Sequence, residues 1–329
     1  MPATIYYHAD CLDGFGAAWA AWRKFGPAAT YRPMHHGDAW LESDIDGRDI
    51  YILDFSFPPE TLEAMAERAA SVTQIDHHAS ARLAWCGRLE KCPENGERFD
   101  DPARRLHVIF NMEHSGTALA WAHFHPGADL PLLLRHIEDI DLWRFALPGT
   151  RPVCRALRLA PFVFPAWDDL IAHTPDTAAP AYRNLLTQGE ANETFYQTEV
   201  QRLANGSLVM SARLRGEPVD ALQAVRHGQD VISDGESTWL AVEGLAINAS
   251  ALFASELGNL LAERSGSFAA IWQLAPDGEA KVSLRSKGDF DVSDIAARYG
   301  GGGHRNAAGF RLPMQRFLSE VLAQPKTFE

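Results

Sequence analysis

The sequence has few cysteines, no long apolar run and no basic N-terminal segment. Its four cysteines are scattered and form no Cys-x-x-Cys pair, which argues against a disulfide framework and a cysteine-rich zinc or redox site. No apolar stretch reaches the ~18–20 residues that a membrane-spanning helix needs. The first basic residue is Arg23, so the charged start of a signal peptide is missing. We therefore expect a soluble, cytoplasmic protein without membrane association.

Positive charge is also scarce, since 30 Lys and Arg oppose 43 Asp and Glu and the net charge is −13. A protein that coats long nucleic acid usually carries a basic face, so no long duplex nucleic acid is expected as a partner. The basic residues are unevenly placed. Residues 142–158 contain four arginines and no acid, and residues 281–311 contain six Lys and Arg against three Asp. These two basic islands could receive a small anion.

Length and pattern predict two α/β domains. The 329 residues suggest two or three domains, and a content of 46% hydrophobic and 22% charged residues is ordinary for a globular protein. Strand-like runs alternate with helical runs near the N-terminus, which predicts a parallel sheet with helices on its faces. The strand candidates are Thr4–Tyr7, Asp49–Leu53 and Ser71–Ile75.

The expected domain boundaries follow from irregular segments. A loop is expected over residues 84–101, and the proline-rich stretch from Pro148 to Pro180 is the expected joint between domains. A long amphipathic helix, Gly189–Ala204, would act as a connector. We assign residues 1–150 to a catalytic α/β domain, 151–205 to a linker with this connector helix, and 206–329 to a smaller α/β substrate-binding domain.

Metal-ligand residue types follow each of the three predicted strands. They are His8, Asp10, Cys11 and Asp13 after the first, Asp54 after the second, and Asp76-His77-His78 after the third. In a parallel sheet these ends meet at one edge, where ligands bind. Any one such residue alone is better explained as a turn or a cap. Buried together, several carboxylates are very costly unless cations neutralise them, so the pattern favours a metal site.

The ligand types indicate which metals to expect. Mixed carboxylate and imidazole ligands favour manganese, with magnesium, cobalt and zinc as alternatives. Two cations that share a carboxylate can stabilise the attacking and leaving oxygens of phosphoryl transfer. Asp139 and Asp141 offer further carboxylates, although the segment 137–143 also fits the end of a helix followed by a turn.

A glycine run near the C-terminus is the second candidate site. Gly300 to Gly303 precede His304 and Arg305, and glycine lets backbone N–H groups approach an anion closely. Arg285 and Ser286 lie upstream. The alternative is a flexible loop, but the adjacent cationic residues favour anion binding.

Two of these motifs resemble those of one known family. The triplet Asp76-His77-His78, with acids at the ends of the two preceding strands, resembles the DHH phosphoesterase superfamily, which is named for it. The segment Gly301–Gly309 is similar to the Gly-Gly-Gly-His…Ala-Ala-Gly signature of the DHH-associated C-terminal domain. The resemblance implies two domains around a cleft, with a two-metal site, typically manganese, on the first.

The resemblance also implies roles for individual residues. It makes His78 a phosphate-binding or proton-transferring residue, Asp54 the bridge between metals, and Asp76 a group that orients its neighbours. The implied metal ligands are His8, Asp13, Asp54, His77 and Asp141, with Asp139 as the fallback for the last. The C-terminal domain would hold the rest of the substrate. From the glycine run and the polar residues near it, the expected substrate-binding residues are Arg285, Ser286, Gly301, Gly302, Gly303, His304 and Arg305.

The first motif departs from the family pattern. The family usually has two aspartates one residue apart after the first histidine, and here that spacing gives Cys11 and Asp13, with Asp10 one position earlier. Asp10, Cys11 or water would complete the first metal site. A cysteine ligand would soften the site and change its metal preference.

These features predict a manganese-dependent phosphoesterase that acts on a small phosphorylated or nucleotide substrate. A short-oligonucleotide exonuclease or cyclic-nucleotide phosphodiesterase is favoured, and a short-chain polyphosphatase or pyrophosphatase is the alternative. The altered first motif keeps a rival open, a nucleotide-binding sensor without catalysis. A third hypothesis is a structural metal-bound protein. The sequence leaves the choice between monomer and homodimer open.

Overall fold

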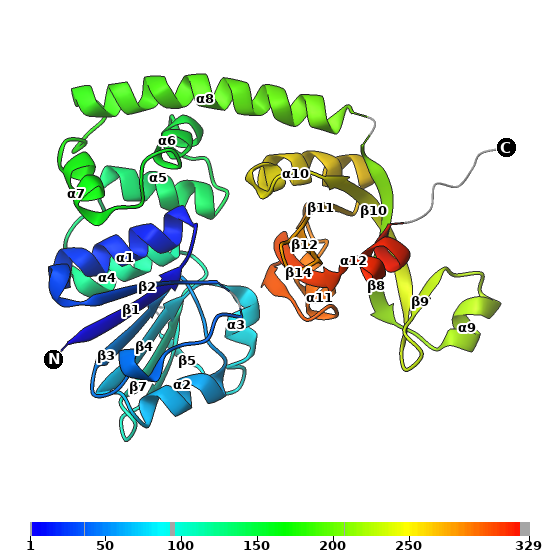
Figure 1. The fold of residues 1–329 in the computed structure, drawn as a ribbon, viewed down its shortest axis with the longest axis horizontal. Coiled ribbons are helices and arrows are strands. Elements are labelled where there is room, and N and C mark those ends of the chain that lie inside the picture. Colours follow the sequence, from blue (N-terminus) through cyan, green and yellow to red (C-terminus); the bar gives the residue numbers. More distant parts are fainter. Residues whose placement is uncertain (1, 36, 93–95, 207, 323–329) are drawn as a thin grey trace. The chain divides into compact units, whose positions relative to one another are not determined.

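The structure is a computed structural model that describes residues 2–35, 37–92, 96–206 and 208–322. The chain divides into two compact units, Met1–Thr194 and Phe195–Glu329. Each unit contains a seven-stranded sheet with helices packed on it (Figure 1). The predicted class, two α/β domains, is confirmed. No helix within the described ranges has the length and hydropathy needed to cross a bilayer.

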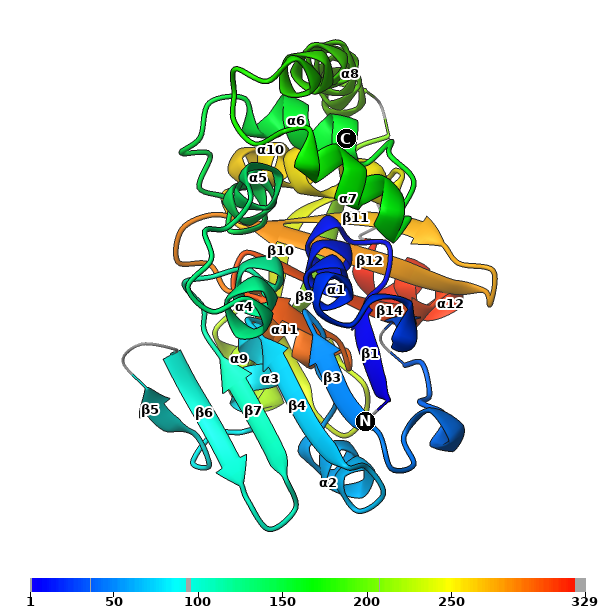
Figure 2. The same cartoon turned by 90° about the vertical axis from the view of Figure 1, so that its left-hand side faces the viewer.

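The N-terminal sheet is mostly parallel. Its strands, in spatial order, are β2 (Thr30–Met34), β1 (Ala3–His8), β3 (Asp49–Leu53), β4 (Ser71–Asp76), β7 (Leu106–Phe110), β6 (Gly96–Asp101) and β5 (Glu90–Cys92). The first five are parallel, and the hairpin of β5 and β6 adds antiparallel strands beside β7, as Figure 2 shows. The strands expected from the sequence are therefore present within a larger mixed sheet.

Helices cover both faces of this sheet. The unit contains α1 (Leu12–Phe25), α2 (Pro59–Ala66), α3 (Ala79–Leu83), α4 (Gly116–Phe124), α5 (Leu132–Asp141), α6 (Thr150–Leu157), α7 (Phe164–Ala172) and most of α8 (Pro180–Ala204). On one face, Ala17 and Ala20 of α1 pack with Ala120 of α4 against Ile5 and Ile75 of the strands. Leu62 and Met65 of α2 belong to the core on the other face. Small side chains on α1 and α4 allow the two helices to lie close to each other and to the strands.

Two segments differ from the sequence expectation. The expected loop at residues 84–101 contains β5 and β6, whose polar sequences lack the alternation that marks a half-buried strand. The expected joint contains α6 and α7. Trp167 of α7 packs against Phe15 of α1, and Cys154 of α6 belongs to the same core, which places this stretch in the N-terminal unit. Proline is compatible with a helix here, because Pro165 lies in the first turn of α7, where proline is tolerated.

The strand order explains where a ligand site can form. The chain runs from β1 to β2 on one side and then to β3 on the other side of β1. The crossovers after β1 and β3 therefore leave the sheet in opposite directions, and such a switch point opens a crevice at the C-terminal ends of the strands. His8 ends β1, and Asp54 directly follows β3. Both residues thus lie at the switch point.

The C-terminal unit is built around a second mixed sheet. Its strands, in spatial order, are β13 (Gly302–His304), β14 (Ala307–Pro313), β12 (Glu279–Ser286), β11 (Phe268–Leu274), β10 (Thr238–Asn248) and β8 (Met210–Pro218), with β9 (Val231–Ser233) beside β10. Its helices are α9 (Ala221–Arg226), α10 (Ala254–Ser265), α11 (Val292–Ala297) and α12 (Met314–Arg316). The glycine run is thus the start of a β-hairpin, β13–β14, rather than a flexible loop.

Candidate metal centre

Two groups of ligand-type side chains meet at Asp54. One group consists of His8, Cys11 and Asp54, and the other of Asp13, His77 and Asp141. The Oδ1 atom of Asp54 lies 3.1 Å from Nε2 of His77, and its Oδ2 atom lies 3.5 Å from Nδ1 of His8. Each oxygen of one carboxylate therefore faces a different group. This is the arrangement expected of a carboxylate that bridges two cations.

The backbone at Asp54 is unusual and tightly enclosed. Its φ angle of 51° is in the left-handed region, which costs free energy for a residue other than glycine. A Cβ atom on Gly116 would lie 2.4 Å from Cβ of Asp54, so only glycine fits there. Gly14 has the same role beside His8, since its Cβ would lie 2.2 Å from the His8 carbonyl oxygen. Both positions explain how two helix N-termini approach the strand ends so closely.

Asp13 connects the cluster to the start of α4. Its side chain is 1% exposed, and its carboxylate accepts hydrogen bonds from the backbone N–H groups of Gly116 (2.6 Å) and Thr117 (3.0 Å). The Thr117 hydroxyl donates to the Asp13 carbonyl at 2.6 Å, and Ser115 caps the helix. The positive end of the helix favours a carboxylate here. Oδ2 of Asp13 still lies 3.5 Å from Nε2 of His77.

His77 lies at the centre of three carboxylates. Its Nε2 atom is 3.1 Å from Asp54 and 3.5 Å from both Asp13 and Asp141. Burial alone would lower the pKa of His77, but the hydrogen bond to Asp54 and the charge of Asp141 raise it well above its usual value. Burial and the neighbouring charge of Asp54 raise the pKa of Asp13. The three carboxylates around His77 therefore carry more negative charge than one imidazolium can neutralise.

This cluster passes a test of fit for divalent cations. The Oδ2 atom of Asp54 is fully buried, and no group in the described part of the chain donates a hydrogen bond to it. A buried carboxylate oxygen without a donor is costly unless a cation is its partner. Oxygen and imidazole donors suit manganese and related ions. The residues present therefore fit a two-cation site.

The structure distinguishes between the candidates in the first motif. Cys11 precedes α1 and lies with His8 and Asp54, and burial raises the pKa of its thiol. Asp10 does not join either group. Its carboxylate is 90% exposed and lies 3.2 Å from Nε2 of His35, because a left-handed backbone (φ 54°) turns the side chain outward. The expectation that Asp10 could ligate a metal is not supported by this placement.

The structure also distinguishes Asp139 from Asp141. The Asp139 carboxylate accepts hydrogen bonds from the N–H groups of Ala146 (2.8 Å) and Leu147 (3.0 Å) and from the hydroxyl of Thr150 (2.5 Å). It is therefore committed to the loop between α5 and α6. Asp141, two residues later on α5, faces His77 instead.

Asp76 lies behind the cluster and orients the two histidines that follow it. Its Oδ1 atom accepts hydrogen bonds from the His77 backbone N–H (2.8 Å) and from Nδ1 of His78 (2.7 Å). Its Oδ2 atom accepts one from the Ser56 hydroxyl at 2.5 Å. Burial opposes ionisation, but His78 lowers the pKa of Asp76 to about 2. Sequence reasoning missed Ser56, although a hydroxyl two residues after Asp54 was a signal for it.

In the C-terminal unit, two predicted substrate-binding residues share one row of the sheet. Arg285 on β12 pairs with Ala307 on β14, and Ala307 pairs with His304 on β13. Directly paired residues point to the same face, so Arg285 and His304 lie on one side of the hairpin. Burial lowers the pKa of Arg285 to about 10. Gly302 and Gly303 belong to β13, and Gly301 precedes it.

Two other predicted substrate-binding residues have contacts inside this unit. The Ser286 side chain is buried, its hydroxyl donates to the Phe290 carbonyl at 2.7 Å, and it accepts from Asn306 at 2.9 Å. It therefore ties the loop after β12 to the hairpin and does not present its hydroxyl as a ligand-binding group. Arg305 is exposed and lies 3.3 Å from Asp289. Asn306, which sequence reasoning missed, also donates to two backbone carbonyls of this loop.

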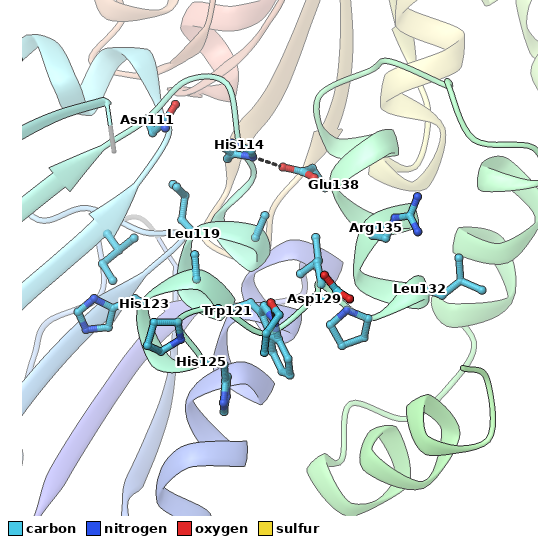
Figure 3. A pocket seen from close by; sticks show the side chains of 18 of the residues that line it. Asn111, His114, Leu119, Trp121, His123, His125, Asp129, Leu132, Arg135 and Glu138 are labelled. Atoms are coloured by element: carbon cyan, nitrogen blue, oxygen red, sulfur yellow. Dashed lines mark hydrogen bonds and ion pairs between the residues drawn. The ribbon is translucent and has the colours of Figure 1, made fainter. Parts of the chain in front are cut away.

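A groove of about 1360 Å³ lies elsewhere in the N-terminal unit, along α4 and α5 (Figure 3). Its walls include His114, Trp121 and Arg135, and none of the cluster residues line it. His114 Nδ1 and Glu138 form an ion pair of 2.7 Å at one end, and this contact raises the pKa of His114. The groove is thus separate from the cluster.

The comparison with known domain families gives one match. Residues 242–327 match the DHHA1 domain. The match covers most of β10, the strands β11 and β12, and the glycine-rich hairpin β13–β14, so it confirms the resemblance to the DHH superfamily drawn from the signature at Gly301–Gly309.

The chain is also similar, at low sequence identity, to individual proteins. Over 324 residues the chain is 26% identical to “Uncharacterized protein R106” of Acanthamoeba polyphaga mimivirus; the match covers 93% of this chain and 66% of that protein. RecJ from Thermus thermophilus, solved in complex with Mn2+, has a TM-score of 0.44 at 14% identity, covering 97% of this chain and 50% of RecJ. PggH from Vibrio cholerae, a pGpG-specific phosphodiesterase, has a TM-score of 0.37 at 11% identity, covering 97% and 94%.

Proposed function

We propose that this chain, a DHH-family protein by its DHHA1 domain at residues 242–327, is a metal-dependent phosphoesterase. The observation that carries the proposal is the position of Asp54 between two ligand groups. Its two oxygens face His77 and His8 at 3.1 and 3.5 Å. A carboxylate shared in this way would hold two cations close together, as in two-metal phosphoryl transfer.

The residues divide naturally into two ligand sets. Asp13, His77 and Asp141 would hold one cation together with Asp54, and His8 and Cys11 would hold the other with the same carboxylate. Manganese is the metal we favour because most of these donors are oxygen and imidazole. When bound, two such cations would lower the pKa of a water molecule and neutralise charge on the reacting phosphate.

The chain's own residues would position the substrate and move the proton. Asp76 fixes the ring of His78 through Nδ1, so Nε2 of His78 is the atom that would contact phosphate or protonate the leaving group. Ser56 and Asp13 keep this edge of the sheet rigid through their hydrogen bonds. The aligned Arg285 and His304 would bind a distal phosphate.

The substrate we favour is a short oligonucleotide or a cyclic nucleotide. The acidic chain disfavours long polymers, and a separate glycine-rich domain suits a substrate larger than pyrophosphate. Short-chain polyphosphate is the second candidate. The sensor hypothesis retains one observation in its favour, the thiol of Cys11 at a position where the family has a carboxylate.

Two aspartates with the same backbone conformation provide the test. Asp54→Asn and Asp10→Asn both replace a residue with positive φ, which asparagine tolerates, and both remove one charge. We expect Asp54→Asn to lower kcat/KM in manganese by at least ~10³-fold, since it removes charge between the cations. Asp10→Asn should remain within about threefold of wild type.

The assay uses a dinucleotide, a pentanucleotide, cyclic mono- and dinucleotides and tripolyphosphate, each with a chelator control. Equal activity of Asp54→Asn and wild type would refute the shared-carboxylate site. Tight nucleotide binding without turnover of any substrate by the wild type would favour the sensor instead.

A further inference from the structure

The loop that follows Asp141 contains two aromatic residues in an unfavourable backbone conformation. Trp143 and Phe145 have φ angles of 56° and 51°. Bulky residues rarely adopt the left-handed region, and glycine or asparagine would do so at lower cost. Such strain persists only where surrounding contacts fix it, and it is concentrated at functional sites.

The contacts that fix this loop come from Asp139. Its backbone carbonyl accepts hydrogen bonds from the N–H groups of Arg144 (2.9 Å) and Phe145 (3.4 Å), and its carboxylate accepts from Ala146 and Leu147. The loop is therefore wrapped around a residue two positions before Asp141. The position of the aromatic pair is fixed relative to this ligand of the proposed metal site.

The two rings pack against each other, and a cation lies against both of them. The centroids of Trp143 and Phe145 are 4.7 Å apart in an edge-to-face arrangement. The Arg151 guanidinium lies 3.8 Å from the Phe145 centroid and 5.3 Å from that of Trp143. Trp143 is nevertheless 40% exposed. A large aromatic side chain that is held in place and still open to solvent is suited to stacking against a planar ligand.

The same loop accounts for part of the basic island at residues 142–158. Arg155 is buried and forms an ion pair with Glu193 at 2.6 Å, so its role is structural. Arg144 is exposed and donates to the Glu113 carbonyl, next to the segment that caps α4. Arg151 thus places positive charge beside the aromatic pair, whereas the Arg144 guanidinium is directed to Glu113. Stacking surfaces combined with cations are the usual means of binding single-stranded nucleotides.

We propose that Trp143, supported by Phe145 and Arg151, is a stacking platform for a nucleobase next to the scissile phosphate. The inference rests on the proposed phosphoesterase function and narrows its substrate to compounds that carry a base, against polyphosphate. Stacking of one base on an aromatic side chain typically changes affinity by about tenfold or more.

The test compares a dinucleotide with its analogue lacking the base beside the scissile phosphate. We expect wild-type kcat/KM to favour the dinucleotide by about tenfold or more. Trp143→Ala should remove most of this preference, whereas Trp143→Phe, which keeps a stacking ring, should retain most of it. Alanine is strained at positive φ as tryptophan is, so this comparison isolates the ring. Phe195→Ala, at an aromatic residue 67% exposed on α8, is the control.

Each outcome decides the proposal. An unchanged dinucleotide preference in Trp143→Ala, with full activity, would overturn the platform and leave the phosphoesterase intact. Absence of turnover by the wild type would instead overturn the proposed function. Calorimetry with a non-hydrolysable dinucleotide would then test the platform, since weaker binding to Trp143→Ala than to wild type supports it and equal binding overturns it. Trp143→Gly separates function from folding, because it relieves the φ strain. Loss of the base preference in Trp143→Gly at an unchanged melting temperature supports the inference. If Trp143→Gly unfolds and Trp143→Ala retains the base preference, the inference is refuted.

Discussion

Substituting Gly116 by alanine should displace Asp54 without replacing any residue of the cluster. The added methyl group would lie 2.4 Å from Cβ of Asp54 and 2.7 Å from its Oδ1. Non-bonded carbon atoms prefer ~3.5–4.0 Å, so one partner must shift by about 1 Å. Asp54 cannot swing away at the far end of a flexible chain, because the closest atom is its own Cβ. Gly116 in turn is held by the hydrogen bond to Asp13.

The expected magnitudes follow from this shift. Overpacking of this kind costs about 1–3 kcal/mol, which corresponds to roughly 2–12 °C in the melting temperature of a unit of this size. A displacement of about 1 Å at a reacting centre lowers the rate by about 10²-fold. Gly116→Ala should therefore lose ~100-fold in kcat while remaining folded.

The control is a glycine substitution outside the cluster that lowers the stability of the fold. Gly47 has a φ of 65° and open space around its missing Cβ, so Gly47→Ala introduces backbone strain of about 1–2 kcal/mol without a clash. Circular dichroism melting and manganese-dependent phosphodiesterase rates would be measured on both variants. A rate for Gly116→Ala within about threefold of wild type, at a lowered melting temperature, would refute the claim that this contact sets the position of Asp54.

Three further predictions concern other residues. Cys11→Asp should abolish the thiolate-to-metal charge-transfer absorption of the cobalt-substituted protein, and a wild-type spectrum without that band would contradict ligation by Cys11. Asp76→Asn should lower kcat by ~10–100-fold because an amide keeps only one acceptor oxygen and no charge to orient His78, and unaltered kinetics would show that the ring needs no carboxylate partner. Burial lowers the pKa of His136 to about 4, whereas an unfolded histidine titrates near ~6.5. The unfolded chain therefore binds more protons between these values, and the free energy of unfolding should fall by up to about 3 kcal/mol as the pH drops through them. In urea titrations across this range, His136→Gln should show a flatter dependence, and an unchanged slope would count against this assignment.

The metal cluster was predictable because it depends on sheet topology. Ligand-type residues at the ends of successive strands must converge if the strands are parallel and adjacent, and β1, β3 and β4 are both. His8, Asp54 and His77 could thus be placed together from the sequence alone. This inference depends only on the alternation of strands and helices, and hydrophobic periodicity is the primary sequence signal for that alternation.

The choice between neighbouring residues could not be predicted in the same way. Asp10 and Cys11 are adjacent, and a single left-handed residue at Asp10 sends one side chain to solvent and leaves the other beside His8. Asp139 and Asp141 lie two residues apart near the end of α5, and their roles depend on which one the following loop surrounds. Such details are set by tertiary contacts that leave no periodic trace in the sequence.

In the C-terminal motif, the sequence predicted one shared role for residues whose roles differ in the structure. Arg285 and Ser286 are consecutive on β12, so their side chains point to opposite faces of the sheet. Only one of two neighbours in a strand can therefore share a face with His304, and the register with Ala307 selects Arg285. Ser286 consequently contributes through the hydrogen bonds that hold the hairpin loop.

The candidate metal cluster and the loop after Asp141 share one backbone feature. Asp54, Trp143 and Phe145 all adopt left-handed backbone conformations that their side chains disfavour. A chain selected for stability alone would replace such residues by glycine or asparagine, since each strained residue costs about 1–3 kcal/mol. We therefore expect the carboxylate at 54 and the ring at 143 to act through what they contact. Asp54 adjoins His77 in space, and Trp143 follows Asp141 by two residues. Under the proposed function, a phosphate bound near Asp54 would therefore bring an attached base toward Trp143.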